Sequence, residues 1–408
     1  MAIQSIPASG TAADLSSDRG VAIGSSVVKF LRWASIPFML GVVISYLGFS
    51  WDVQWHTDVG PDTFFTAPHL MLYSGIAIAG LTCLVVTLVC TAAARRGDTT
   101  TITQTISVLR GRYRAPIGYL VGGLAAASFL LYGGIFDQWW HGLYGFDVTL
   151  ISPPHVGLIL SIFLIMIGAL VAMSGDVRQA RAAGASPWMA VIVLGLAASV
   201  LFSFLTPTAV EAHSLFLGIF IWPSIATTLI FATMLTMVTS IARVPGSTLV
   251  AGVVYTLLLG ITWVFVPWVT REYAASVGLF VRDTANGYPA VPGFLPLYLG
   301  VAALAVEAIF LSARRRSWSM RLTAMAAGAA TAVILVMVQP IPGVYRSYFE
   351  TMLPPEIWGD IASGIDASYW PTVVLCAGIG ALAGWFGWNL GVVLRQMPNI
   401  TTRQERHP

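Results

Sequence analysis

The chain has 408 residues, of which 57% are hydrophobic and only 10% are charged, and its mean hydropathy is +0.79. This composition excludes an ordinary soluble globular protein and is typical of a polytopic membrane protein. The formal net charge of +3 does not indicate a nucleic-acid partner, because the basic residues are spread over loop ends and form no patch. The three cysteines have no CxxC spacing and give neither a disulfide framework nor a thiolate metal site.

The predicted elements are almost entirely membrane-length helices. Residues 1–25 are rich in Ala, Ser, Gly and Asp, and we expect a flexible cytoplasmic tail there. Apolar runs of about 20 residues, the length that crosses a bilayer as a helix, follow along the chain. The ten runs lie near 27–50, 68–94, 115–139, 153–174, 187–206, 213–242, 247–269, 291–312, 320–339 and 371–394. The sequence therefore predicts an all-α, polytopic integral membrane helical bundle surrounded by membrane lipids.

The distribution of Arg and Lys predicts the orientation of this bundle. Of the 21 Lys and Arg residues, 18 fall on one side of the predicted spans, and only Arg271, Arg282 and Arg346 fall on the other. Because cytoplasmic loops retain positive charge, we expect a plasma-membrane protein with both termini in the cytoplasm. The stretches 270–290 and 340–370 would then be external, and we expect connecting loops there.

Residues 52–69 form the most informative stretch of the chain. Asp52 and His56 are four residues apart and therefore share one face of a helix. Pro68 favours the first turn of the next helix, so His69 should project from the start of that helix. Two antiparallel helices would bring these three possible ligands together and leave room for an exogenous fourth ligand.

The same arrangement occurs a second time. Asp137 and His141 follow Asp52 and His56 by 85 residues, and His155 follows His69 by 86 residues, again just after a proline. Helix caps and interfacial aromatic residues could explain one such hairpin without a metal, but they do not require the same spacing twice. We therefore expect two hairpins that carry metal ligands and pack side by side.

Two further acidic residues recur at the same offset. Asp62 and Asp147 lie in the predicted turns, where Asp commonly satisfies the turn backbone. Their recurrence leaves open a role in orienting a ligand histidine from behind. The metal itself is not specified, because histidine with carboxylate and without thiolate suits copper, zinc, iron or manganese.

The spacing of Asp52, Trp55, His56 and His69 resembles the copper motif in the C subunit of particulate methane monooxygenase and its ammonia monooxygenase relatives. The second hairpin resembles the second motif of that subunit, and the likeness covers about residues 27–240. The resemblance implies one or two copper ions, with zinc or iron as alternatives. It also implies dioxygen-dependent hydroxylation of a small apolar substrate, or of ammonia.

The resemblance also implies which residues hold the metals. Asp52, His56 and His69 would hold the first copper and serve as the catalytic site. In the family, a neighbouring site uses an Asn and a His of the second motif together with the shared His of the first. Those positions correspond to Asp137, His141 and His69, with His155 nearby, so that Asp137 stands where the family has Asn.

The resemblance also implies A- and B-like partner subunits. A homo-oligomer is the alternative assembly, and the electron donor would be external, such as a quinol, because the sequence carries no flavin, nicotinamide or haem fingerprint. We expect a metal-site membrane domain at 26–245, additional transmembrane helices at 246–395 and a cytoplasmic tail at 396–408. The alternative function is a non-catalytic metal-binding scaffold or subunit.

Overall fold

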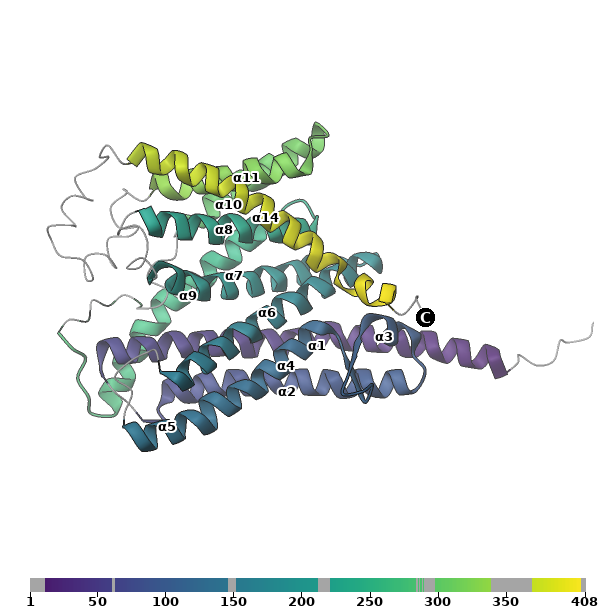
Figure 1. Cartoon of the computed structure of the whole chain (residues 1–408), viewed down its shortest axis with the longest axis horizontal. Helices are drawn as coiled ribbons and strands as arrows, with labels where there is room; N and C mark the ends of the chain where they lie inside the picture. The colour runs from purple at the N-terminus through teal and green to yellow at the C-terminus, as the bar shows by residue number, and fades with distance from the viewer. Residues whose placement is uncertain are drawn as a thin grey trace, which may run out of the picture.

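The structure is a computed structural model. It describes the backbone of residues 12–60, 63–145, 152–211, 221–283, 298–338 and 369–404, together with residues 285, 287 and 289. The side chains of residues 12–25, 207–211, 221–223 and 398–404 lie outside the described part. The elements, drawn in Figure 1, are α1 (Ala12–Asp58), α2 (Ala67–Arg95), α3 (Thr99–Gln104), β1 (Ile106–Val108), β2 (Tyr113–Ala115), α4 (Ile117–Phe129), the π-helix η1 (Leu130–Phe136), α5 (Asp137–Tyr144), α6 (Pro153–Ala182), α7 (Trp188–Glu211), α8 (Ile221–Ala242), α9 (Ser247–Ser276), α10 (Leu299–Arg315), α11 (Met320–Val338) and α14 (Tyr369–Gln404).

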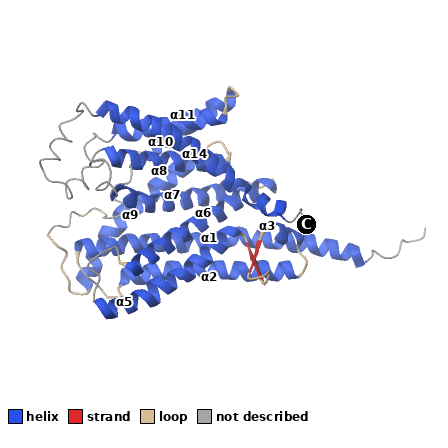
Figure 2. Ribbon diagram, in the orientation of Figure 1, coloured by secondary structure: helices blue, strands red, loops and turns tan. Residues whose placement is uncertain are grey.

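The described elements are those of an all-α polytopic membrane protein. By length and composition, nine of the helices in the described ranges could cross a membrane. The run predicted near 291–312 is described as the 17-residue helix α10, which packs between α9 and α11. Figure 2 shows that the described chain is mainly helical. Its described strands are the short antiparallel pair β1 and β2, in which Ile106 pairs with Ala115.

The single helix predicted over 115–139 is divided into three continuous parts. The regular helix α4 passes into the seven-residue π-helix η1, and α5 continues from it. A π-helix is rare and occurs often at functional sites. Here it directly precedes Asp137, the first predicted ligand of the second hairpin.

Two helical hairpins form the N-terminal half. The first joins α1 to α2, and the second joins α4, η1 and α5 to α6, with α1 and α5 ending at the same end of the bundle (Figure 1). Within the first hairpin, glycines allow the backbones to approach closely, since a Cβ added to Gly48 would lie 2.4 Å from the nitrogen of Leu72. The hairpins pack against each other through α2 and α4, where Tyr73 and Phe129 have ring centroids 5.8 Å apart. The expectation that the hairpins lie side by side is confirmed.

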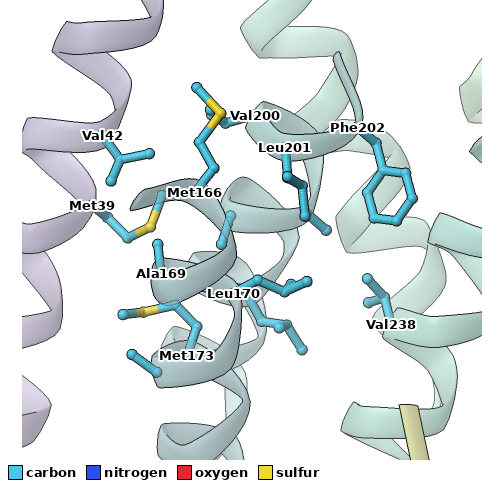
Figure 3. Close-up of a cluster of buried hydrophobic side chains, with 14 of the residues drawn as sticks. Met39, Val42, Met166, Ala169, Leu170, Met173, Val200, Leu201, Phe202 and Val238 are labelled. Atoms are coloured by element: carbon cyan, nitrogen blue, oxygen red, sulfur yellow. The ribbon is translucent and has the colours of Figure 1, made fainter. Parts of the chain in front are cut away.

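The helix α6 lies at the centre of the hydrophobic core. Its side chains face α1 on one side and the pair α7 and α8 on the other (Figure 3). This arrangement joins the N-terminal hairpins to the C-terminal helices in one continuous core. The labelled residues of the cluster are Met39 and Val42 from α1, Met166, Ala169, Leu170 and Met173 from α6, Val200, Leu201 and Phe202 from α7, and Val238 from α8.

The helix α9 crosses the bundle obliquely and reaches the first hairpin (Figure 1). Its N-terminus is capped by the buried Glu307 of α10, whose carboxyl oxygens accept hydrogen bonds from the backbone N–H groups of Gly246 (2.7 Å) and Thr248 (3.2 Å). Its C-terminus extends to Ser276. Residues 270–276, predicted as part of a loop, are therefore the last two turns of this helix, and they lie against α1.

Candidate metal centres

The first candidate centre is built from the end of α1 and the start of α2. Asp52 and His56 project from one face of the last turns of α1, as their spacing predicts, and His69 projects from the first turn of α2 after Pro68. Oδ1 of Asp52 lies 2.9 Å from Nε2 of His69 and 3.7 Å from Nε2 of His56. The carboxylate and both imidazoles therefore converge on one point.

The histidine of α2 is held in a defined orientation by the turn that precedes it. Nδ1 of His69 donates to the backbone carbonyls of Thr63 (3.2 Å) and Phe64 (3.3 Å). A proton on Nδ1 leaves the lone pair on Nε2, which is the nitrogen that faces Asp52. The ring also stacks on Tyr73, with an interplanar angle of 18° and centroids 5.8 Å apart.

The second candidate centre repeats this geometry in α5 and α6. Oδ1 of Asp137 lies 3.4 Å from Nε2 of His141 and 3.5 Å from Nε2 of His155. Nδ1 of His141 donates to the carbonyl of Gly145 (2.9 Å), so its Nε2 also keeps the lone pair. At the start of α6, the hydroxyl of Ser152 caps the helix by accepting the N–H of His155 at 3.4 Å.

Both clusters are compact enough to hold a metal ion after a small contraction. In each, the three possible ligand atoms lie within 4.8 Å of one another. Ligand atoms held at about 2.0–2.2 Å from one metal ion are separated from each other by roughly 3–3.5 Å. Oδ1 of Asp52 is buried but makes no hydrogen bond of acceptable geometry, although Nε2 of His69 is only 2.9 Å away. Such a pair is expected where both atoms point at a common ion instead of at each other.

The structure thus brings all six predicted metal ligands into two groups of three. Asp52, His56 and His69 form one group, and Asp137, His141 and His155 form the other. His69, which the family resemblance implied as a shared ligand, belongs to the first group, and the second group is completed by His155.

Asp62 and Asp147, predicted to orient ligand histidines, lie outside the described residues.

The sequence reasoning missed the contacts that the C-terminal half makes with the first centre. The hydroxyl of Tyr273 accepts the N–H of Ala67 at 3.4 Å, and its ring lies 5.0 Å from that of Trp55. Arg282 bonds to the last carbonyls of α1. The sequence did contain one indication of the Arg282 contact, because Arg282 is one of the few basic residues on the same side of the predicted spans as the hairpin turns.

Comparison with known proteins adds no relative: no family model matches the chain, and no curated protein or solved structure is significantly similar to it.

Proposed function

We propose that this membrane protein binds copper in each of its two Asp-His-His clusters. The observation that carries the proposal is the repetition of the geometry: two hairpins of the same chain bring one carboxylate and two imidazole Nε2 atoms together. Helix capping or an interfacial location would not require the same convergence twice. Imidazole and carboxylate without thiolate suit copper, and they leave zinc and iron as the alternative metals to be distinguished by analysis.

The proposed chemistry is dioxygen-dependent hydroxylation of a small apolar substrate, or of ammonia. Three protein ligands leave a coordination position open, and a copper ion bound there would supply the redox chemistry toward dioxygen. The chain's own residues would hold and orient that ion. The carboxylate of Asp52 would offset part of its positive charge, and the carbonyls bonded to His69 would keep Nε2 directed at it. Electrons would come from a quinol or a partner subunit.

A non-catalytic metal-binding scaffold is the second candidate function. Each cluster joins the end of one membrane helix to the start of the next, so an ion bound there would also tie the two helices of a hairpin together. A structural role would predict that metal removal lowers the unfolding temperature without any oxygen uptake by the loaded protein. Oxygen consumption that requires a reductant, and that is lost with the first cluster, supports the enzyme instead.

Location and orientation are part of the same proposal. The apolar helices support a membrane-embedded protein, and the excess of basic residues opposite the hairpin turns favours a plasma-membrane protein with both clusters on the non-cytoplasmic side. Copper on that side would be loaded without passing through the cytoplasm.

Metal analysis by mass spectrometry tests the proposal directly. The purified protein should hold up to two copper ions at neutral pH. His56→Ala and His69→Ala should each remove one, and His141→Ala and His155→Ala should each remove the other. His407→Ala is the matched control, because it removes a histidine from the far C-terminus. A wild-type protein without stoichiometric metal, or cluster variants with unchanged metal content, would contradict the proposal.

A further inference from the structure

The two hairpins are repeats of one another, and within the described residues the segment that follows α9 is hydrogen-bonded to the first. Residues 279–282 follow the end of α9, and Arg282 reaches the end of α1. The backbone N–H of Arg282 donates to the carbonyl of Asp58 at 2.7 Å. Its guanidinium Nη1 donates to the carbonyls of Thr57 at 3.1 Å and of His56 at 3.4 Å. One residue therefore binds three successive carbonyls at the end of the helix that carries two metal ligands.

These carbonyls are the groups that a helix end leaves without a partner inside the helix, and a cation there also opposes the negative end of the helix dipole. His56 is itself a predicted ligand, so its backbone is held from one side by Arg282 while its side chain faces Asp52 on another. The orientation of the last turn of α1 thus depends on a residue more than 200 positions away in the sequence.

The side chains next to this contact in the first hairpin differ from those at the equivalent positions of the second hairpin. In the first hairpin, Gln54 and Asp58 are 1% and 6% exposed, and Nε2 of Gln54 donates to Oδ2 of Asp58 at 2.6 Å. The positions 85 residues later are Trp139 and Leu143, which are 53% and 59% exposed. A buried polar pair is replaced by two exposed apolar side chains, so the second hairpin has no carboxylate at the position of Asp58, the acidic side chain that attracts Arg282 in the first hairpin.

Tyr273 makes a second contact between α9 and the first hairpin. It lies against Trp55 of α1 and accepts the N–H of Ala67, the first residue of α2. In the second hairpin the residue equivalent to Trp55 is Trp140, which packs within its own helix against Tyr144, with ring centroids 4.4 Å apart. The first centre is therefore braced by the C-terminal half, and the second is braced locally.

We infer that Arg282 is a positioning residue of the first centre alone, and that it makes metal binding there, but not at the second centre, dependent on the C-terminal half of the chain. This inference rests on the proposed function. Outer contacts that orient metal ligands typically change metal affinity by about 10–100-fold. Because Arg282 acts through the backbone of the ligand helix, we expect an effect at the lower end of this range.

The duplication supplies the internal control for the test. Copper affinity is measured by titration with Cu²⁺ in two backgrounds, His155→Ala, which leaves the first centre, and His69→Ala, which leaves the second. Arg282→Ala keeps the backbone bond to Asp58 and removes only the guanidinium. It should weaken binding about 10-fold in the His155→Ala background and leave the His69→Ala background unchanged. Arg282→Lys should recover part of the affinity.

Arg271→Ala is the matched control for charge, because Arg271 also acts electrostatically on Asp58 but makes none of the bonds to the α1 carbonyls. It should leave copper binding at the first centre nearly unchanged. An equal effect of Arg282→Ala in both backgrounds, or no effect in either, would overturn the inference. If Arg271→Ala weakens copper binding at the first centre as much as Arg282→Ala does, the effect is one of charge and not of positioning, and the inference is overturned as well.

A measurement without metal separates this inference from the proposed function. Hydrogen exchange of the amides in residues 55–60 should accelerate in Arg282→Ala, because the helix end frays, while exchange in residues 141–145 stays the same. If the unmodified backgrounds bind no copper, the proposed function fails, and the exchange experiment still decides whether Arg282 holds the end of α1. Unchanged exchange in residues 55–60 would overturn the positioning role whatever the metal result.

Discussion

Replacing Gly48 with alanine should separate the two helices that carry the first centre. A Cβ at this position would lie 2.4 Å from the nitrogen and 2.7 Å from the Cα of Leu72, whereas ordinary van der Waals contact begins at 3.4 Å. Both neighbours are backbone atoms and cannot turn aside, so α1 and α2 must move apart by roughly 1 Å at this level. Asp52 is one turn after Gly48, and His69 is one turn before Leu72.

The displacement is large compared with what a metal site tolerates. Ligand distances within a site are held to about 0.2 Å, so a shift of roughly 1 Å should weaken copper binding at the first centre about 10-fold or more. Overpacking of this kind typically lowers the free energy of unfolding by about 1–3 kcal/mol. Thermal unfolding in detergent measures the stability, and copper titration in the His155→Ala background measures the centre.

Two glycines provide controls for this variant. Gly133 is the position 85 residues after Gly48, but a Cβ there would meet the Cδ1 of Leu158 at 3.0 Å, the far end of a flexible side chain. Gly133→Ala should therefore cost less than Gly48→Ala. Gly260 has no atom within 4 Å of an added Cβ, so Gly260→Ala should be neutral or raise stability by up to about 1 kcal/mol. A Gly48→Ala protein that unfolds and binds copper like Gly260→Ala would refute the reasoning.

Three further outcomes are expected. Glu307→Ala should lower the free energy of unfolding by about 1–3 kcal/mol, because it leaves the N–H groups of Gly246 and Thr248 without their acceptor. Glu307→Gln keeps one acceptor oxygen and should lower the free energy of unfolding by less. Thermal unfolding measures both variants. A cysteine that replaces the exposed Thr57 should react with a membrane-impermeant maleimide on intact cells, whereas a cysteine that replaces the exposed Arg110 should react only after permeabilisation. The three native cysteines are buried and should give a low background. The reverse labelling pattern would invert the proposed orientation. Copper affinity, measured by titration at a series of pH values, should fall as the pH is lowered, because protons compete with the metal for the imidazole nitrogens. An affinity that does not change with pH would argue against histidine ligands.

The geometry of each centre was predictable because it depends on local rules. Four-residue spacing places Asp52 and His56 on one face of any α-helix, and a proline in the first turn fixes where the next helix begins. Two antiparallel helices joined by a short turn then bring His69 to the same end. The hydrophobic runs predicted the membrane helices for the same reason, since length and apolarity are properties of single segments.

The contacts between distant segments were not predictable from such rules. Nothing in the local pattern around Tyr273 or Arg282 indicates that they reach the end of α1, because that contact depends on the oblique path of α9 through the whole bundle. The π-helix was missed because hydrophobic periodicity in a short, uniformly apolar run does not reveal one extra residue.

The π-helix η1 makes the two copies of the hairpin respond differently to changes in chain length. Each residue of an α-helix turns the following side chains by roughly 100°, so deleting one residue within 45–51 of the regular helix α1 would rotate Asp52 and His56 away from α2. A π turn holds one residue more than an α turn, so η1 can lose a residue by becoming regular helix while Asp137 keeps its direction. The second hairpin can therefore lose one residue within η1 without turning its ligands, whereas the first hairpin cannot. Single-residue deletions in the lineage of this protein should be tolerated at 130–136 but not in the turns of α1 that precede Asp52.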